Sequence, residues 1–499
     1  MSNLYHSTRD ASHSVTSKQA ILAGLAPDGG LFVSDALTQG ELSADLASVC
    51  SKDYLGIAKD ILALLLPDFS REEVSCCVSS AYGPRFDTAA ITPLVSFGDD
   101  WLLELWHGPT CAFKDVALQM LPRLMSVARQ DLHSASNVMI VCATSGDTGK
   151  AALEGFSNVA GTGVTVFYPA GGVSDIQHLQ MVTQRGGNVA VCGIHGNFDD
   201  AQTQVKRIFS DPALAERLAA ANTVLSSANS INIGRLVPQV SYYFSAYAQL
   251  VRSGVIHVGN EVEYCVPTGN FGDVLAGYYA KLLGLPVARL TVASNENDVL
   301  TEFISTGTYN RLRPFKRTIS PSMDILVSSN LERLLYYLSG GDCAYVRQLM
   351  EQLASEGHYH VSNAVFNQMK NVFSCGKATD EQTRATIQQT WEDEGLLIDP
   401  HTAVAAHVLS ETPRTPGVPR ICLSTANPYK FSSDVLAALG ADVSGMDGFA
   451  CMDRLHDMTG MSIPQQLFEL RSLPQLHTGT CEQGQMSDFV EQAAEKVFS

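Results

Sequence analysis

The chain has 499 residues, of which 45% are hydrophobic and 17% are charged, and its formal net charge at pH 7 is −18. Nucleic acids and anionic membranes are disfavoured as partners, because their phosphate groups select clustered cations. The first residues lack the apolar core of a signal peptide, and no apolar run approaches the length of a membrane span, so we expect a cytoplasmic protein.

Twelve cysteines are present, and none are paired at C-x-x-C spacing. Several of them stand singly in apolar, strand-like runs, for example Cys142 and Cys265. Buried, reduced thiols fit this pattern better than a disulfide framework or a zinc site. Because the sequence has no H-E-x-x-H motif and no cluster of Cys and His ligands, we expect no metal site.

The first part of the chain is predicted to be mainly helical. Apolar residues recur at helical spacing between residues 15 and 82, and a turn at Pro27–Gly30 leads into the short apolar run 31–33. This pattern predicts a helical N-terminal cap domain over residues 1–84 without a catalytic unit of its own.

Short apolar runs and helical patterns then alternate, which is typical of parallel sheets covered by helices on both faces. Two such blocks predict an α/β catalytic core of two lobes over residues 85–430, followed by a helical tail over residues 431–499. Ligands of such folds bind at the carboxyl ends of the strands. The expected strands are 138–143, 164–169, 189–194, 264–268, 288–294 and 421–425, and the expected helices include 175–183, 199–209 and 236–251.

Two loops at predicted strand ends have the composition of anion sites. The first, ATSGDTG, contains Ser145, Gly146, Asp147 and Thr148 and opens a helix whose backbone N–H groups would face an anion. The alternative is an ordinary helix cap by Ser or Asp. The second, GNFGD at residues 269–273, repeats the arrangement with two glycines three apart, which allow the backbone to approach a ligand closely.

Neither loop carries the G-x-G-x-x-G or G-x-x-x-x-G-K-[ST] pattern, which argues against a nicotinamide dinucleotide and against a P-loop nucleotide. Two phosphate-type loops without a nucleotide motif predict a small phosphorylated cofactor. A third strand-end loop, LSTANPYKF, offers the hydroxyl of Thr425 for a ring nitrogen, although by itself it is a common kind of turn.

Lys114 stands between Phe113 and Asp115, shortly after the Gly108-Pro109 break. Taken alone, it is a surface lysine with an apolar stem. Together with two anion loops it predicts a desolvated amine of lowered pKa that binds pyridoxal phosphate covalently.

These stretches resemble the threonine synthases, which are pyridoxal-phosphate enzymes of the tryptophan-synthase-β-like fold, or fold type II. The resemblance covers nearly the whole chain in the family's order, in APDGGLFV, ELWHGPTCAFKD, ATSGDTG, SANSINIGRLVPQ, VPTGNFGD, DPHTA and LSTANPYKF. It implies that Lys114 carries the cofactor and that Thr425 meets the pyridine nitrogen. The loop implied to hold the cofactor phosphate contains Gly269, Asn270, Phe271, Gly272 and Asp273.

The resemblance also implies a substrate site and a reaction. Residues 145–148 would hold the substrate carboxylate, with Asp147 near the 3′-oxygen of the cofactor. The implied reaction converts O-phospho-L-homoserine and water into L-threonine and phosphate, with Lys114 moving protons at Cα and Cβ. A phospho-lyase that releases a 2-oxo acid is the nearest alternative, and a non-catalytic homologue is another.

The chain departs from the family pattern at two places. Residues 170–172 are Ala-Gly-Gly where family members usually have a basic residue, and Asn427 replaces a histidine that is often present. Because a buried phosphate needs a cationic partner, we expect Arg235 or Lys150 to supply it, with Arg235 the better bidentate ligand. We expect a monomer or a homodimer.

Overall fold

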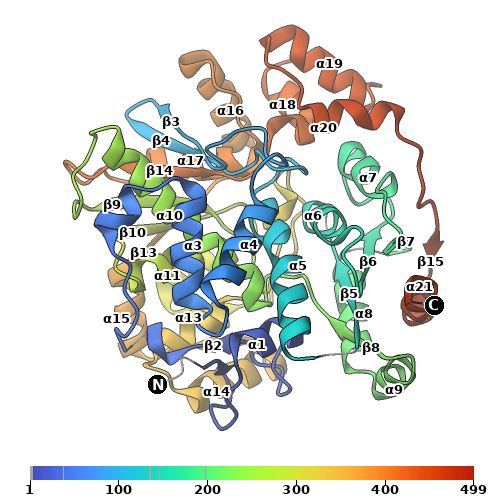
Figure 1. Ribbon diagram of the computed structural model, residues 1–499. Helices are drawn as coiled ribbons and strands as arrows, with labels where there is room; N and C mark the ends of the chain where they lie inside the picture. The colour runs from blue at the N-terminus through green and yellow to red at the C-terminus, as the bar shows by residue number, and fades with distance from the viewer. Residues whose placement is uncertain (1–3, 38, 134–135, 145, 197, 499) are drawn as a thin grey trace.

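A six-stranded sheet and a five-stranded sheet form the framework of the computed structural model, which describes residues 4–37, 39–133, 136–144, 146–196 and 198–498 (Figure 1). Within those ranges the larger sheet is parallel except at its β3–β4 edge, which is antiparallel. Its strands, in spatial order, are β13 (Phe373–Lys377), β10 (Val287–Ser294), β9 (Val262–Pro267), β14 (Arg420–Ser424), β4 (Asp100–Glu104) and β3 (Leu94–Phe97).

The smaller sheet is parallel throughout its described strands. In spatial order these are β15 (Thr480–Cys481), β7 (Val189–Ile194), β6 (Thr162–Pro169), β5 (Asn137–Ala143) and β8 (Thr223–Ser226). Its inner strands β5 and β6 are almost wholly buried, because helices cover both faces. The prediction of an α/β fold with two helix-covered parallel sheets is confirmed.

The six strands predicted from apolar runs are all present, with ends displaced by at most two residues. Several of the other described strands had no clear signal in the sequence. Among them, β8 is only four residues long, β13 contains Ser, Gly and Lys, and β15 has two residues. The predicted helical tail therefore also contains a strand, which extends the smaller sheet at its β7 edge.

The N-terminal segment is mainly helical, as predicted. Its elements are β1 (His6–Ser7), α1 (Ser17–Ala23), β2 (Phe32–Val33), the 3-10 turn η1 (Asp35–Leu37), α2 (Leu46–Cys50), α3 (Tyr54–Leu65) and α4 (Arg71–Ala81). Helices α1 and α4 contact α5 (Lys114–Asp131), and α2 and α3 contact α10 (Ile233–Arg252). The segment shares one hydrophobic core with the larger lobe, since Ile57 and Ile61 belong to the same cluster as Leu118 and Val240.

The remaining helices cover the two sheets or close the C-terminal part of the fold. The smaller sheet is surrounded by α6 (Asp147–Phe156), α7 (Asp175–Val182), α8 (Phe198–Ser210), α9 (Pro212–Ala220) and α21 (Met486–Phe498). The rest of the fold contains α11 (Gly272–Leu282), α12 (Val299–Thr306), β11 (Thr308–Asn310), η2 (Pro321–Met323), α13 (Leu331–Leu338), α14 (Cys343–Ser355), β12 (His358–His360), α15 (Asn363–Val372), α16 (Asp380–Glu394), α17 (Pro400–Glu411), η3 (Pro428–Phe431), α18 (Ser432–Ala438), α19 (Gly448–Thr459), α20 (Gln465–Phe468), η4 (Glu469–Ser472) and η5 (Gln483–Gln485).

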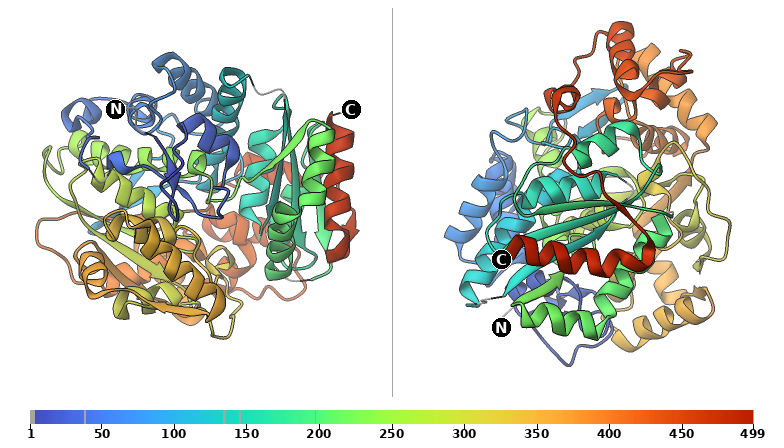
Figure 2. Two further views of the ribbon diagram at one scale, coloured as in Figure 1. Left: turned by 90° about the horizontal axis from the view of Figure 1, so that it is seen from below. Right: turned by 90° about the vertical axis from the view of Figure 1, so that its right-hand side faces the viewer.

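The C-terminal helix α21 lies across the outer face of the smaller sheet (Figure 2). Its residues Met486 and Val490 pack in one cluster with Met139 and Val141 of β5. None of the described helices has both the length and the apolar character needed to cross a bilayer.

Candidate active site

A cavity of about 860 Å³ lies where the segments that follow β5, β9 and β14 meet. Lys114, Asp147, Arg235, residues 269–273 and Thr425 all line it. The carboxyl ends of strands from both sheets contribute to the walls, which is the position predicted for a ligand in such folds.

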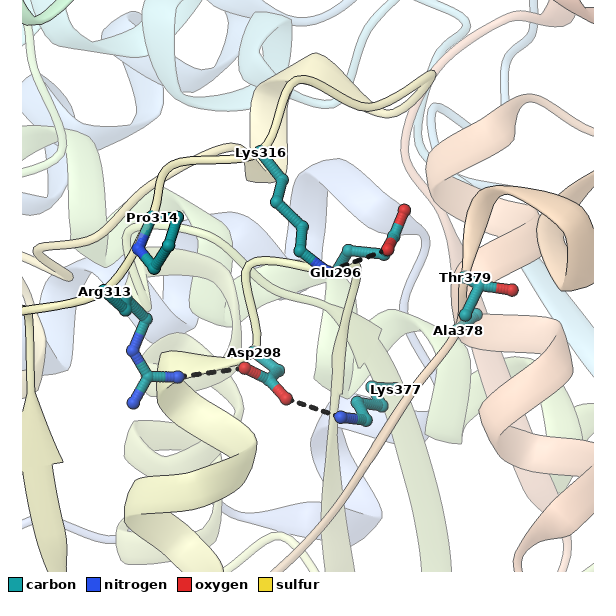
Figure 3. A pocket seen from close by; sticks show the side chains of 8 residues that line it. All are labelled: Glu296, Asp298, Arg313, Pro314, Lys316, Lys377, Ala378 and Thr379. Carbon is teal, nitrogen blue, oxygen red and sulfur yellow. Dashed lines mark hydrogen bonds and ion pairs between the residues drawn. The ribbon is translucent and has the colours of Figure 1, made fainter.

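A smaller pocket of about 280 Å³ lies elsewhere, beside β10 and β13 (Figure 3). Its charged side chains already pair with one another: Asp298 accepts from Arg313 at 2.9 Å and from Lys377 at 2.7 Å, and Lys316 lies 3.0 Å from Glu296. Because it contains none of the predicted site residues and its charges are matched, we assign the chemistry to the larger cavity.

Lys114 is the first residue of α5 and is only 8% exposed. Its Nζ lies 3.2 Å from Oδ2 of Asp147 and 3.5 Å from Oγ of Ser322, and it stands 4.7 Å from the centre of the Phe113 ring. Burial lowers the pKa of Lys114; Asp147 opposes this decrease, and Arg235 adds to it. The sequence prediction of a desolvated lysine is consistent with this placement.

Asp147 begins α6 and is 2% exposed. Its Oδ1 lies 2.8 Å from Nζ of Lys430 and accepts a hydrogen bond from Nε2 of Gln177 at 2.9 Å. Burial alone would raise the pKa of Asp147, but the charges of Lys430 and Lys114 outweigh it and hold that pKa well below its ordinary value. The carboxylate is therefore ionised inside the protein.

Gly146 precedes Asp147 with φ at 133° and does not line the cavity. A Cβ at this position would meet the Gln177 amide at 2.4 Å, so glycine is needed for Gln177 to reach Asp147. Thr148 lines the cavity. The remaining predicted residue of this loop, Ser145, lies outside the described residues.

Among the described residues, α5, α6, α11 and α13 begin at the cavity with an N-cap residue whose side chain makes no capping hydrogen bond. In α6 the Thr144 hydroxyl accepts from the N–H of Gly149 in the first turn. In contrast, α1, α3, α4, α7 and α10 each begin with a capping side chain. Uncapped N–H groups at the positive end of a helix are suited to bind an anion. The alternative of an ordinary Ser or Asp cap was raised for α6, where the N-cap residue is Gly146 and Ser145 lies outside the described residues.

The GNFGD loop turns sharply into α11. Phe271 has φ at 60°, in the left-handed region, and its side chain is buried against Phe373. A Cβ on Gly269 would lie 2.8 Å from the carbonyl oxygen of Ser322, so this glycine lets the loop pack against the segment that carries Ser322. Asn270 connects the loop to the start of α13, because its backbone carbonyl accepts a hydrogen bond from the backbone N–H of Asn330 at 3.1 Å.

Asp273 directs its carboxyl group toward α10. Its Oδ1 accepts hydrogen bonds from Tyr242 at 2.5 Å and Tyr243 at 2.9 Å, while Oδ2 is buried without a hydrogen-bond partner among the described residues. Burial raises the pKa of Asp273 to about 6, against the effect of both tyrosine hydroxyls. The carboxyl group thus orients the start of α11. The part of Asp273 that can bind an anion is its backbone N–H.

Arg235 and Lys150, the two candidates for the substrate phosphate, differ in position. Arg235 lines the cavity, is 5% exposed and donates one hydrogen bond, from Nη1 to the carbonyl of Ala228 at 3.0 Å, while its Nε has no partner within the described chain. Lys150 is not a lining residue and pairs with Glu154 and Gln184. Of the two candidates, Arg235 lines the cavity and Lys150 does not.

Several residues of the site were not predicted. Ser322 lies between Lys114 and Asp147, and its backbone N–H donates to Nε2 of His401 at 3.1 Å. Nδ1 of His401 is in turn 2.7 Å from Asp399. Asp399 and His401 both belong to the DPHTA motif, which the sequence analysis recognised without assigning it a contact in the site. Ser322 had no signal in the sequence.

Three family models match consecutive parts of the chain. A model described as pyridoxal-phosphate dependent enzyme matches residues 92–422, one described as threonine synthase N terminus matches residues 4–82, and one described as threonine synthase, C-terminal, matches residues 402–475. A threonine synthase from Pseudomonas aeruginosa is 39% identical over 86% of this chain and 89% of its own length. The chain belongs to the threonine synthase family.

Solved structures agree with this membership. The yeast threonine synthase superimposes with a TM-score of 0.87 at 32% identity and covers 99% of both chains. A threonine synthase from Brucella melitensis with bound pyridoxal phosphate has a TM-score of 0.86 at 36% identity, over 99% of this chain and 100% of its own. The fold is therefore that of the type II pyridoxal-phosphate enzymes.

Proteins named threonine synthase-like 1 are equally similar to this chain. The human protein is 38% identical over 84% of this chain, and the chain spans only 58% of its length. Family membership makes the chain a pyridoxal-phosphate-dependent enzyme, and the cavity fits that cofactor: it offers a buried amine on Lys114 and an uncapped helix start at α11.

Proposed function

We propose that this chain is a threonine synthase, a lyase that converts O-phospho-L-homoserine and water into L-threonine and phosphate in threonine biosynthesis. The observation that carries the proposal is the buried Lys114 amine, 3.2 Å from Asp147, in a cavity that also receives the uncapped start of α11. Family membership and the threonine synthases among its relatives support the substrate assignment.

We assign the cofactor contacts as follows. Lys114 binds the cofactor covalently, the backbone N–H groups of residues 269–273 hold its phosphate at the start of α11, and the Thr425 hydroxyl lies at its ring nitrogen. When bound, pyridoxal phosphate supplies an electron-withdrawing ring that stabilises negative charge on the carbons of the substrate. The substrate carboxylate is assigned to residues 145–148 at the start of α6.

Lys114 is also the group that moves protons. Once the substrate amine has displaced it, Lys114 is a free amine whose neutral form is favoured by burial. It removes a proton from Cα of the substrate, gives that proton up, and then removes a second proton from Cβ. The Cγ–O bond then breaks, and phosphate leaves with the bonding electrons. Protonation at Cγ, addition of the hydroxyl group of water at Cβ and return of a proton to Cα complete the product. Ser322, 3.5 Å from the amine, orients Lys114 between these steps.

Product identity tests the proposal. Purified holoenzyme is incubated with O-phospho-L-homoserine, and the products are separated by chromatography while phosphate is measured in parallel. Equal amounts of threonine and phosphate are expected. Phosphate accompanied by 2-oxobutyrate instead of threonine would favour a phospho-lyase, the second candidate, which the 38% identity to the threonine synthase-like 1 proteins keeps open.

Arg235 is proposed to bind the substrate phosphate, because it is a buried cation of the cavity wall whose Nε has no hydrogen-bond partner among the residues that the structure describes. Replacing it with leucine is expected to raise KM for O-phospho-L-homoserine by about 10- to 100-fold, the value of a lost charge-assisted hydrogen bond. Inhibition by free phosphate should weaken, while the absorbance of the bound cofactor is retained. Steady-state kinetics and a visible spectrum measure these effects.

Lys150→Leu is the matched control, since Lys150 is also cationic but pairs with Glu154 outside the cavity. Its KM should stay near that of the unchanged enzyme. An Arg235→Leu enzyme that loses the cofactor band, or that keeps its KM, would assign Arg235 a structural role. Lys206 and Arg311, the other lining cations without a carboxylate partner in the described chain, would then be the next candidates.

We further propose a cytoplasmic protein that acts as a monomer or homodimer. All twelve cysteines are free, which fits a reducing compartment.

A further inference from the structure

Lys430 is a second buried lysine beside the candidate active site. It belongs to η3, directly after β14, and its side chain is completely buried. Its Nζ donates to the carbonyl of Thr110 at 2.8 Å and lies 2.8 Å from Oδ1 of Asp147. Lys430 does not line the cavity, and the mechanism above gives it no part.

Asp147 is therefore shared by two ammonium groups, one on each carboxylate oxygen: Lys430 on Oδ1 and Lys114 on Oδ2. Other charged or titratable groups of the described chain act on the two lysines from neighbouring elements. The charge of Arg235 on α10 repels that of Lys114, and the carboxyl group of Asp273 on α11 also interacts electrostatically with Lys114. Asp115 of α5 and the Cys111 thiol lie close enough to Lys430 to feel its charge. His401 contacts the group through Ser322, whose backbone N–H donates to its Nε2 at 3.1 Å.

Of these two lysines, Lys114 lines the cavity and Lys430 does not, so Lys114 alone of the two can contact a bound substrate. A lysine that moves protons must give up its charge at some point of the cycle. If Lys114 were the sole partner of Asp147, this change would leave a buried carboxylate unpaired, and such a group takes up a proton instead. Lys430 stays beside Asp147 whatever the state of Lys114.

We propose that Lys430 is a positioning residue: a fixed counter-ion that keeps Asp147 ionised while Lys114 changes its charge, and so frees Lys114 to act as a neutral amine. The inference rests on the assignment of Lys114 under Proposed function. Under this proposal the third strand-end loop contributes two residues to the site: Thr425 at the cofactor ring and Lys430 at Asp147.

The pKa directions agree with this arrangement. The positive charge of Lys430 contributes to the lowered pKa of Lys114 and is the largest single charge that lowers the pKa of Asp147. With Lys430 neutral, the whole attraction of Asp147 would fall on Lys114, and the pKa of Lys114 should rise.

The test measures when Lys114 becomes neutral, using full-length protein freed of its cofactor with hydroxylamine and checked by circular dichroism for retained structure. The second-order rate constant for recombination with pyridoxal phosphate is recorded against pH, because only the neutral amine reacts. Lys430→Met is expected to move the midpoint upward by about one pH unit, which slows recombination roughly 10-fold below the midpoint.

Lys430→Arg, which keeps the charge, should leave the midpoint nearly unchanged, and Asp147→Asn should move it downward. If the methionine variant does not fold, Lys430→Gln, which retains a hydrogen-bond donor, gives the decisive midpoint. A lysine that only anchors the carbonyl of Thr110 would change the cofactor Kd without moving the midpoint, and that result would overturn the inference.

The outcomes separate this inference from the proposed function. Borohydride reduction after recombination shows which lysine carries the cofactor, so a label on another residue refutes the role of Lys114 and with it the basis of the inference. If Lys114 is labelled and the Lys430 variants shift the midpoint, the inference stands even where the product is not threonine.

Discussion

Lys114→Ala is expected to abolish covalent cofactor attachment and to lower kcat by at least about 10³-fold, because one side chain serves as both attachment point and proton carrier. The protein should remain folded, since Asp147 keeps Lys430 at 2.8 Å and Gln177 at 2.9 Å after the amine is removed. Turnover is measured with saturating cofactor, and far-UV circular dichroism checks the fold.

Peptide mapping after borohydride reduction completes this prediction. In the unchanged enzyme the reduced cofactor should be found on the peptide that contains Lys114, and in the variant it should be absent from all peptides. Lys150→Ala, a change of the same type outside the cavity, should retain both the label and the activity. A label on a different lysine in the unchanged enzyme would contradict the assignment.

Asp147→Ala is expected to lower the free energy of unfolding by about 3–5 kcal/mol, because it leaves the buried cations of Lys114 and Lys430 without their shared carboxylate. The experiment uses urea unfolding of the cofactor-free protein, so that cofactor binding does not add to the stability of the folded state. Removing one partner of an exposed pair, with Asp453→Ala, should cost less than about 1 kcal/mol.

The effect should depend on pH in a defined direction. The pKa of Asp147 is lowered in the folded state, so its contribution is complete above the unfolded-state value of 3.8 and is lost as the pH falls further. The difference between the unchanged protein and Asp147→Ala should therefore be full at neutral pH and shrink below pH 3.8. A difference that is equally large at low pH would mean that Asp147 acts through packing and not through its charge.

The parts of the site that could be predicted from sequence are those whose signal is local. Lys114 stands directly beside apolar residues at the start of a helix, and the loop at 269–273 follows its strand at once. Lys114 and this loop lie close together because the carboxyl ends of parallel strands are at the same edge of a sheet. The strands themselves were visible as continuous apolar runs, whereas the mixed composition of β13 gave no such signal.

The unpredicted parts depend on contacts between distant segments. Lys430 is significant only because β14 pairs with β4 and so brings η3 beside Thr110 and Asp147. Ser322 reaches Lys114 because Gly269 leaves room for its backbone and His401 holds its N–H. Neither contact has a sequence pattern of its own, since the partners are separated by many residues and come from different elements.

The place of β15 and α21 has a consequence for how the chain folds during synthesis. The inner strands of the smaller sheet are complete once β8 has left the ribosome at Ser226, yet the strand that pairs with the β7 edge begins only at Thr480. Roughly 250 residues separate the two, or about 13–50 s of translation at ordinary rates. During this interval an unpaired strand edge and the apolar face beneath Met486 and Val490 are open to other chains. The small lobe therefore cannot cover its β7 edge or this apolar face before β15 and α21 have been synthesised.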